Sequence, residues 1–431
     1  MFRKISDEIM LRGTCYDNLR VLCKTVGNRI SGSPQAAKAV TWGQHTMRAT
    51  GADNVYLQPA DVPYWYRGKE QLQLKIGKKY KQVPALSLGN SQGTNGKTLK
   101  APIIMVHNFD EFKALPESAV KGKIVFFDYR FRQDIIFTFE AYGDAVKYRA
   151  NGASVAVEKG AVGVIIRSMS TGKDDFPHTG GMHYKDSSKK IPEMAIGNAT
   201  ADLLEKECAH SIVMAKMRSE CHMMPDAVHS YNVIGEIKGT ETPERIITIG
   251  GHLDSWDVGE GATDDGAGCV QSMEVIRAFK ALGLRPKCTI RAVLFMNEEN
   301  GDKGGEAYAD SAKSKHEDHV LAIETDAGGF SPRGIGLEMN EDRKRQITGY
   351  KDLFLPYGVY DFSREEGGTD IDPIHKMLKV PAAGLMPDCQ RYFDVHHTDN
   401  DVFENVNHRE LKLGAVVLAQ LIYVVSEHGL Y

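Results

Sequence analysis

The sequence contains little cysteine for its length. Seven cysteines in 431 residues, with no Cys-x-x-Cys pair among them, are too few for a disulfide-built scaffold. Because seven is an odd number, at least one cysteine is unpaired within the chain. Cysteine usage therefore leaves the redox compartment of the protein open.

Long hydrophobic runs are also missing. The longest apolar stretch, Leu413–Val425, contains Gln420 and falls short of the roughly 20 residues that cross a bilayer. We predict that it is a buried helix and that the chain has no membrane span. The first residues, MFRKISDEIMLRGT, place charges where a signal peptide has its apolar core, so the chain as given shows no export signal.

The chain has almost no excess of charge of one sign. The 53 basic and 57 acidic residues leave a formal net charge of -4. Bulk charge therefore gives no attraction to phosphate backbones or anionic lipids, and we expect no nucleic-acid partner. At about 150 residues per domain, the length indicates two or three domains.

The pattern of apolar and polar residues changes twice in the first half of the chain. A helix is expected over 34–50, with Ser33 as N-cap and Pro34 in its first turn. Alternating apolar and polar residues over 52–100 indicate hairpins. Residues 101–228 contain three β-rich apolar runs around one helical stretch, which predicts a compact module resembling a β-sandwich or barrel.

From residue 232 onward, short apolar strands alternate with amphipathic helices. The expected strands are 232–238, 245–250, 288–296 and 319–325, and the expected helices are 266–282 and 304–313. This alternation predicts an α/β fold in which a largely parallel sheet is covered by helices on both faces.

Polar residues follow the strands at the edge of this sheet where ligands bind in α/β folds. The segments are Gly250–Asp254, Gly261–Gly266, Asn297–Asn300, Glu324–Gly329 and, much later, His396–Asp399. Each interrupts an apolar pattern with a carboxylate or an imidazole. We therefore expect the five segments to converge on one site.

Each segment taken alone also has an ordinary structural explanation. His252 would be a buried histidine bonded to a backbone carbonyl, and Asp264–Asp265 would cap a helix. Glu298–Glu299 would form a solvated turn, although two like charges after a buried strand are costly unless a cation neutralises them. The joint occurrence of all five segments favours the functional interpretation.

The side chains of these segments indicate a metal site. Imidazole and carboxylate ligands without a thiolate suit zinc, manganese or cobalt, and the carboxylates suffice for two ions that share one bridging ligand. Three carboxylates and two neutral histidines around two divalent ions leave a formal charge of about +1, which favours a bound hydroxide.

The segments HLDSWDVGEGATDDGAG, NEENG, ETDAGGF and HHTDND together resemble the co-catalytic di-zinc exopeptidases, a family of aminopeptidases and glutamate carboxypeptidases. The likeness covers essentially the whole chain. Within it, VKGKIVFFD and PHTGG resemble the protease-associated domain that this family carries as an insert. The resemblance implies a three-layer α/β catalytic domain formed by residues 1–66 and 230–431, interrupted by an inserted β-rich domain over 67–229.

The resemblance also implies the ligands of two zinc ions per chain. Asp264 would bridge both ions, His252 and Asp326 would complete one site, and Glu299 and His397 would complete the other. These assignments are carried over position by position from the family.

Further roles follow from the same resemblance. Glu298 would be the general base, and Asp254 would accept the imidazole N–H of the first histidine ligand. His396 would stabilise the oxyanion. The peptide bond within Asp264–Asp265 is expected to be cis.

The function that the resemblance implies is a metallo-exopeptidase acting on short peptides or dipeptides, of aminopeptidase or glutamate carboxypeptidase type. It further implies a homodimer and an exported protein, whether secreted, periplasmic or lysosomal. The alternative is a catalytically silent receptor or binding protein of the same architecture, but such relatives lose ligands that this sequence retains. A single-zinc glutaminyl cyclase is disfavoured by the insert.

Two further residues have a simple expected role. Cys269 lies close to the candidate ligands, and we expect a small core residue rather than a nucleophile. His178 lies in a loop of the inserted domain, and we expect a surface histidine.

Overall fold

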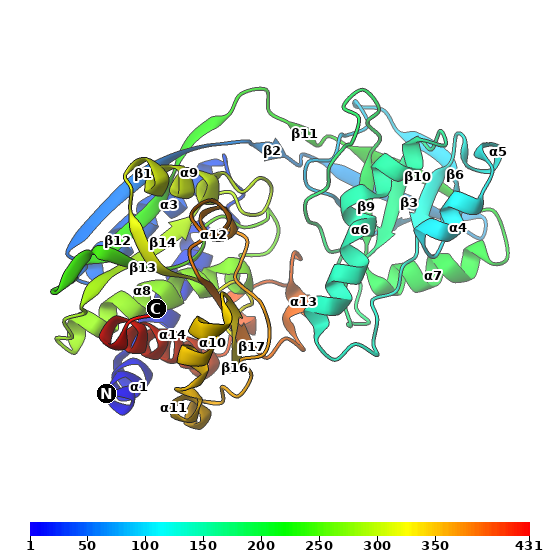
Figure 1. The fold of residues 1–431 in the computed structure, drawn as a ribbon. Helices are drawn as coiled ribbons and strands as arrows, with labels where there is room; N and C mark the ends of the chain where they lie inside the picture. Colours follow the sequence, from blue (N-terminus) through cyan, green and yellow to red (C-terminus); the bar gives the residue numbers. More distant parts are fainter. The chain divides into compact units, whose positions relative to one another are not determined.

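The computed structural model describes residues 1–431, and its contacts divide them into two compact units (Figure 1). The first unit comprises Met1–Pro63, Ala227–Tyr392 and Asp401–Tyr431. The second, called the inserted unit below, comprises Tyr64–Asp226 and Phe393–Asn400. The sequence indicated boundaries at 66/67 and 229/230, and it gave no indication that the short segment 393–400 groups with the inserted unit.

The first unit is built on a seven-stranded sheet in the order β1-β12-β14-β13-β15-β17-β16. The strands are β1 (Asn54–Val62), β12 (Val228–Ile237), β13 (Thr242–His252), β14 (Cys288–Phe295), β15 (Asp318–Glu324), β16 (Pro332–Glu338) and β17 (Ala382–Pro387). Strands β13, β14, β15 and β17 run parallel, whereas β1, β12 and β16 pair antiparallel with their neighbours. The expected parallel sheet is therefore confirmed at its centre only.

Helices cover both faces of this sheet, as predicted. They are α1 (Phe2–Arg12), α2 (Cys15–Val21), α3 (Pro34–Ala49), α8 (Ala267–Ala281), α9 (Lys303–Ser314), α10 (Glu341–Thr348), α11 (Lys351–Phe354), α12 (Asp372–Leu378) and α14 (His408–His428), with short turns η1 (Leu22–Val26), η2 (Ala262–Gly266), η3 (Leu355–Tyr357) and η4 (Phe403–Asn405). One core contains α3, α8 and α14, and the core on the other side contains α9 and α12.

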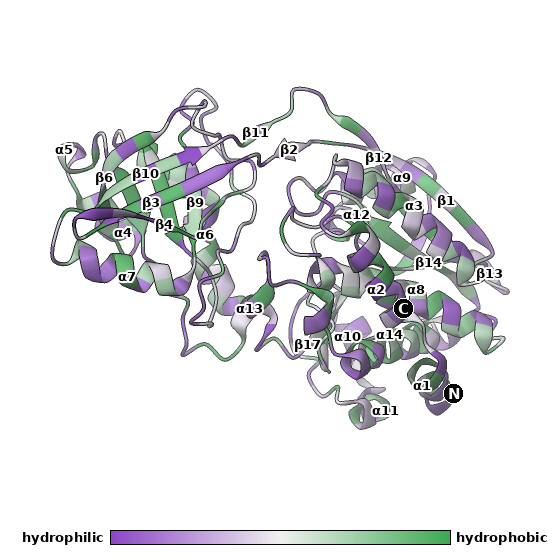
Figure 2. Ribbon diagram, turned by 180° about the vertical axis from the view of Figure 1, so that it is seen from behind, coloured by the Kyte–Doolittle hydropathy of each residue, from purple (hydrophilic) through white to green (hydrophobic).

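Strand β14 shows why the sheet is buried on both sides. Leu294 packs into the core with α8 and α14, while its neighbours Val293 and Phe295 pack into the core with α9 and α12. Successive side chains of a strand point to opposite faces, so a strand between two helical layers is apolar at every position. Figure 2 shows this concentration of hydrophobic residues along β14.

Helix α14 contains the apolar stretch predicted to be buried. It is long and apolar enough to cross a membrane, but 78% of its most apolar window is buried inside the structure. It packs against α8 and α1. The predicted core helix is therefore confirmed.

The expected helix near residue 34 is also confirmed, with the cap that the sequence indicated. Ser33 Oγ accepts the backbone N–H of Ala36 at 3.1 Å, and Pro34 begins α3. The expected hairpins over 52–100 are only partly correct. β3 (Glu70–Ile76) and β4 (Lys79–Val83) form a hairpin, whereas β1 pairs with the distant β12.

The inserted unit holds an eight-stranded sheet in the order β4-β3-β10-β6-β7-β8-β9-β5. The remaining strands of this unit are β2 (Trp65–Tyr66), β5 (Leu86–Ser87), β6 (Leu99–Val106), β7 (Ile124–Phe127), β8 (Gly163–Arg167), β9 (Glu193–Ile196), β10 (Met214–Ser219) and β11 (His222–Met223), where β2 and β11 form a separate ribbon. Its helices are α4 (Phe109–Ala114), α5 (Glu117–Val120), α6 (Thr138–Val157) and α7 (Asn198–Cys208). The short helix α13 (Tyr392–Val395) runs from the first unit into this one.

The sandwich or barrel expected for this region is wrong. Strands β6, β7, β8 and β9 run parallel in one open sheet, with α4 and α6 in the core of one face and α7 in the core of the other. All four residues of β7 are buried, the pattern of a parallel strand between helices. Short apolar runs alone do not distinguish this arrangement from a sandwich core.

Candidate metal centre

Three strand ends of the first unit meet at one edge of its sheet. β13 lies between β14 and β15 and runs parallel to both, so the carboxyl ends of the three strands lie together. His252, the last residue of β13, is opposite Phe295 of β14, and Gly250 is opposite Glu324 of β15. The residues that follow these strands therefore emerge side by side.

His252 is surrounded by carboxylates at this edge. Its Nε2 lies 3.0 Å from Asp264 Oδ1, 3.5 Å from Asp326 Oδ1 and 3.9 Å from Glu298 Oε2. The imidazole is completely buried, and Asp264 is buried as well. The fold thus brings together four residues that the sequence indicated from four separate segments.

Glu299 completes this cluster within the first unit. A side-chain ligand atom from each of His252, Asp264 and Glu299 lies within 4.8 Å of the other two. Glu299 Oε1 accepts the backbone N–H of Trp256 at 3.1 Å, which ties the turn after β14 to the loop after β13. Glu298, its neighbour, keeps its side chain 18% exposed and is therefore accessible to a small molecule.

Asp264 stands in the turn η2, and its peptide bond to Asp265 is cis, as expected. The carboxylate of Asp401 holds this turn from the opposite side. It accepts the backbone N–H of Thr263 at 2.7 Å and that of Asp264 at 3.1 Å. Asp401 therefore fixes the main chain that carries the central carboxylate.

Asp265 caps α8 and also holds the end of β13. One carboxylate oxygen accepts the N–H of Gly268 at 2.9 Å, which is the capping role expected from the sequence. The other accepts the backbone N–H of His252 at 3.1 Å. A side chain at Gly268 would overlap both the Asp265 carboxylate and the carbonyl of Thr325, so glycine permits this close packing.

The contact of Asp254 with His252 differs from the one expected. His252 Nδ1 lies 3.0 Å from the main-chain carbonyl of Asp254 and 3.9 Å from its carboxylate. The carboxylate instead accepts the backbone N–H groups of Asn297 at 2.7 Å and Glu298 at 3.2 Å. A carbonyl acceptor fixes the imidazole tautomer as a carboxylate would.

The electrostatics of this cluster favour a bound cation. Burial opposes the charged imidazole of His252, but the carboxylates of Asp326 and Asp264 outweigh burial and raise its pKa well above its usual range. Burial together with the nearby charge of Asp326 raises the pKa of Asp265. Burial likewise raises the pKa of Asp254 to about 6. These shifts reflect a group of like charges removed from water, which a divalent cation relieves.

Two buried carboxylates behind the cluster were not assigned a role from the sequence. Glu324 accepts the backbone N–H of Ile371 at 3.0 Å through one oxygen, and the carboxylate of Asp370 has no hydrogen-bonding partner. Burial raises the pKa of both groups; the charge of Asp326 adds to the rise at Glu324, and the charge of Glu324 adds to the rise at Asp370. Two features of the sequence could have indicated them. Glu324 is a carboxylate at the end of a strand, directly before Thr325, and Asp370 ends the segment Gly367–Asp370.

Arg29 was also missed. Its buried guanidinium donates to the carbonyls of Leu253 at 2.6 Å, Glu260 at 2.7 Å and Gly261 at 2.8 Å. It therefore braces both ends of the loop between β13 and η2. A lone arginine far from the motifs in sequence gives no signal of this role.

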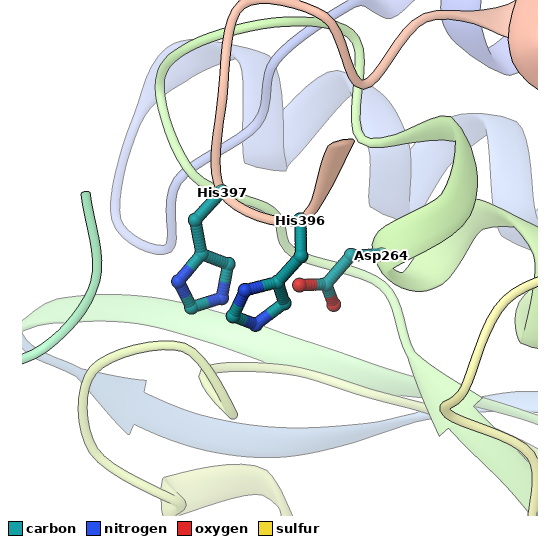
Figure 3. Close-up of side chains that lie close together, drawn as sticks. All are labelled: Asp264, His396 and His397. Atoms are coloured by element: carbon teal, nitrogen blue, oxygen red, sulfur yellow. The ribbon is translucent and has the colours of Figure 1, made fainter. Parts of the chain in front are cut away.

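The two histidines of the HHTDND segment belong to the inserted unit by their contacts. Figure 3 shows the side chains of His396 and His397, together with that of Asp264. The two imidazole rings are stacked, with centroids 3.5 Å apart, and both residues are largely buried.

The remaining two expectations have opposite outcomes. Cys269 is completely buried in the core, and burial raises the pKa of its thiol well above its usual range, so it is a core residue as predicted. The expectation of a surface position for His178 is wrong. It is buried in the inserted unit, and burial lowers its pKa to about 3.

The donor set fits zinc. The cluster of the first unit supplies one imidazole nitrogen and several carboxylate oxygens, which are ligands found in catalytic zinc sites. The nearby Cys269 is a neutral thiol that donates to the carbonyl of His252. Asp326 Oδ1 is buried without a hydrogen-bond donor, as a ligand atom would be. Buried oxygens of this kind call for a cation or a proton.

Comparisons with known proteins give the family. Residues 232–422 match the model of peptidase family M28. Carboxypeptidase Q of Homo sapiens is 33% identical over 413 residues, covering 96% of this chain and 85% of the relative. The crystal structure of a peptidase M28 precursor from Shewanella amazonensis superposes with a TM-score of 0.93 at 32% identity, covering 99% of this chain and 96% of that one.

A more distant structure shares the fold. A zinc aminopeptidase from Bacillus subtilis superposes with a TM-score of 0.67 at 19% identity, covering 95% of this chain and 93% of that one. Identity over nearly the full length, a matching family model and the same fold agree. The chain belongs to peptidase family M28.

Proposed function

We propose that this M28 peptidase is a zinc-dependent exopeptidase that hydrolyses short peptides or dipeptides. The observation that carries the proposal is the buried imidazole of His252 with Asp264, Asp326 and Glu299 at the carboxyl edge of the sheet. The relatives named carboxypeptidase Q and zinc aminopeptidase support the same chemistry.

Five residues would hold two zinc ions. His252 and Asp326 would hold one ion, Glu299 and His397 would hold the other, and Asp264 would bind both. When bound, the zinc ions polarise the peptide carbonyl and lower the pKa of water. The short distances from His252 to Asp264 and Asp326 support the first half of this assignment.

Glu298 is the general base. Its carboxylate takes the proton of the attacking water and delivers it to the leaving amine. Two observations support this role: its side chain is partly exposed beside buried ligands, and its backbone is fixed by Asp254. His396 is assigned to the oxyanion, where a ring N–H donates to the developing charge.

The inserted unit is assigned as a protease-associated domain that limits the length of the peptide substrate. The parallel centre of its sheet and its four helices do not by themselves give a function. Assembly as a homodimer and export from the cell stay predictions from the family resemblance.

The second candidate function is a silent binding protein of the same architecture. The retained cluster of His252 with three carboxylates favours the enzyme, because buried like charges are costly unless a cation neutralises them. Measuring the metal content of protein purified with excess zinc distinguishes the two. Less than one zinc per chain would support the binding protein.

The proposed activity is tested on unblocked dipeptides and their N-acetylated counterparts, with products identified by mass spectrometry. We expect cleavage of the unblocked dipeptides, loss of activity on chelation, and recovery with zinc. Full activity of a Glu298→Gln variant would contradict the mechanism. Cleavage of N-acetylated dipeptides would contradict recognition of a free amino end.

A further inference from the structure

The sheet of the inserted unit has a carboxyl edge of its own, where its parallel strands end. Val106 ends β6 and Phe127 ends β7, and these two residues are paired in register. His107 and Asp128 follow them directly, and the backbone N–H of Asp128 donates to the carbonyl of Val106 at 2.9 Å. Ligands of α/β sheets bind at this edge, so both side chains stand where a ligand is expected.

Asp128 brings a buried oxygen without a hydrogen-bond donor to this edge. The residue is only 1% exposed, and its Oδ1 accepts Nε–H of Arg167 at 2.5 Å. Its Oδ2 has no hydrogen-bonding partner and lies 3.6 Å from His107 Nδ1. Native proteins rarely leave a buried carboxylate oxygen unpaired, so Oδ2 indicates that something binds beside it.

Glu205 of α7 adds a third possible ligand. One ligand atom from each of His107, Asp128 and Glu205 lies within 4.8 Å of the other two. Ligand atoms about 2 Å from a tetrahedral zinc ion lie about 3.3 Å apart, so the 3.6 Å between His107 Nδ1 and Asp128 Oδ2 fits a shared ion. The side chains of His107 and Glu205 are 47% and 31% exposed, which leaves further coordination positions open to water.

Two arginines lie beside this cluster and do not neutralise it. Arg167 bonds to Asp128 and also pairs with Asp202 Oδ1 at 2.8 Å. Arg130 pairs with the same oxygen of Asp202 at 3.1 Å and with Glu205. Three carboxylates therefore stand against two guanidinium groups, and these five side chains keep one negative charge. The net charge at this edge favours a cation over an anion.

We propose that His107, Asp128 and Glu205 bind a divalent transition-metal ion within the inserted unit, with water completing its coordination. Imidazole and carboxylate ligands without a thiolate suit zinc or manganese. The ion joins the ends of β6 and β7 to α7. Because two of its three ligands are exposed, it exchanges with solvent and is lost when free metal is removed, unlike the two zinc ions of the proposed function.

The test adds Mn²⁺ to full-length protein that has been loaded with zinc and then separated from unbound zinc. Mn²⁺ binds a given site more weakly than Zn²⁺, so it should not displace zinc that is held tightly. The electron paramagnetic resonance signal of free Mn²⁺ measures how much the protein binds. We expect one Mn²⁺ per chain in wild type, none in His107→Ala, and affinity lowered about 10-fold or more in Glu205→Gln.

His210→Ala and Asp202→Asn are the matched controls. His210 is an exposed histidine of the same unit, and Asp202 pairs with both arginines but is not a proposed ligand. Both variants should retain one bound Mn²⁺ per chain. Equal binding by wild type and His107→Ala would overturn the proposal, and so would a loss in either control as complete as that in His107→Ala.

The outcome is separate from that of the proposed function. His107 and Glu205 lie outside the proposed zinc ligands, so the zinc content of the chain should be the same in wild type and in all four variants. Mn²⁺ binding that depends on His107 in a chain without tightly held zinc would contradict the proposed function alone. Two zinc ions per chain with no Mn²⁺ bound would contradict the site in the inserted unit alone.

Discussion

Asp254 Oδ1 accepts the backbone N–H of Glu298 at 3.2 Å. The same residue offers its main-chain carbonyl to His252 Nδ1 at 3.0 Å. One residue after β13 therefore orients the first histidine of the cluster and fixes the backbone of the proposed general base after β14. The two proposed functions of the site, holding metal and moving a proton, are therefore linked through Asp254.

Asp254→Asn should lower both zinc affinity and turnover. The amide keeps the size of the side chain and one acceptor oxygen, but it loses the charge that strengthens the bonds from Asn297 and Glu298. We expect a loss of about 10- to 100-fold in metal affinity or in kcat. Asp318→Asn, at an exposed position paired with Arg245, is the control and should behave as wild type. Wild-type kinetics for Asp254→Asn would mean that Asp254 is not needed to orient the base.

Replacing each of the adjacent glutamates separates the two roles assigned to them. Glu298→Gln should reduce kcat by about 10²- to 10⁴-fold, the usual contribution of a general base, while binding two zinc ions. Glu299→Gln should lose affinity for one zinc ion, because it removes a charged ligand. Metal analysis and steady-state kinetics of both variants check this. If only Glu298→Gln loses zinc, Glu298 is the metal ligand and the roles assigned to the two glutamates are reversed.

Asp401→Ala should loosen the turn that carries Asp264. It leaves the buried N–H groups of Thr263 and Asp264 without acceptors, at a cost of about 1 to 3 kcal/mol each. The expected result is a lower melting temperature of the zinc-free protein and a weaker affinity for zinc. Asp399→Ala, two residues earlier and exposed, is the control. Unchanged zinc affinity would show that the turn keeps its shape without Asp401.

The strand ends of the catalytic half were predictable because each is a local pattern. An apolar run that stops at glycines and a carboxylate indicates a strand end, and the parallel topology then places His252, Glu298 and Asp326 together. The resemblance to a known family supplied the division of roles among them. The structure adds the distances, and the roles themselves stay predictions.

The site residues that the sequence did not indicate act through contacts between segments that are distant in the chain. Arg29 and Asp401 bond to backbone groups, and a hydrogen bond to a main-chain carbonyl or N–H leaves no pattern in the partner's sequence. For the same reason, the sequence did not indicate that the main-chain carbonyl of Asp254, and not its carboxylate, contacts His252 Nδ1. Buried parallel strands such as β7 resemble sandwich strands, so the sheet of the inserted unit was misassigned.

Glu193 should make the free energy of unfolding depend on pH, independently of the metal site. It is completely buried in β9, one carboxylate oxygen has no partner, and burial raises its pKa well above its usual range. Above the unfolded pKa of about 4.3, the folded state then retains a proton that the unfolded state releases, so stability falls as pH rises until the folded pKa is passed.

Glu193→Gln should remove this part of the pH dependence. The free energy of unfolding of the variant minus that of wild type should be larger at about pH 8 than at about pH 5. The free energy of unfolding, measured with urea at both pH values, checks the difference. Glu117→Gln, at an exposed position of the same unit, should change neither value. A Glu193→Gln variant with the same pH slope as wild type would show that Glu193 is ionised in the fold.

The measurement that tests the central claim most directly is the zinc content of the purified chain under zinc-replete conditions. The five proposed ligands, His252 and Asp264 among them, predict two zinc ions per chain, one of them lost in His397→Ala. Less than one zinc per chain would contradict the account of the site and of the proposed exopeptidase together.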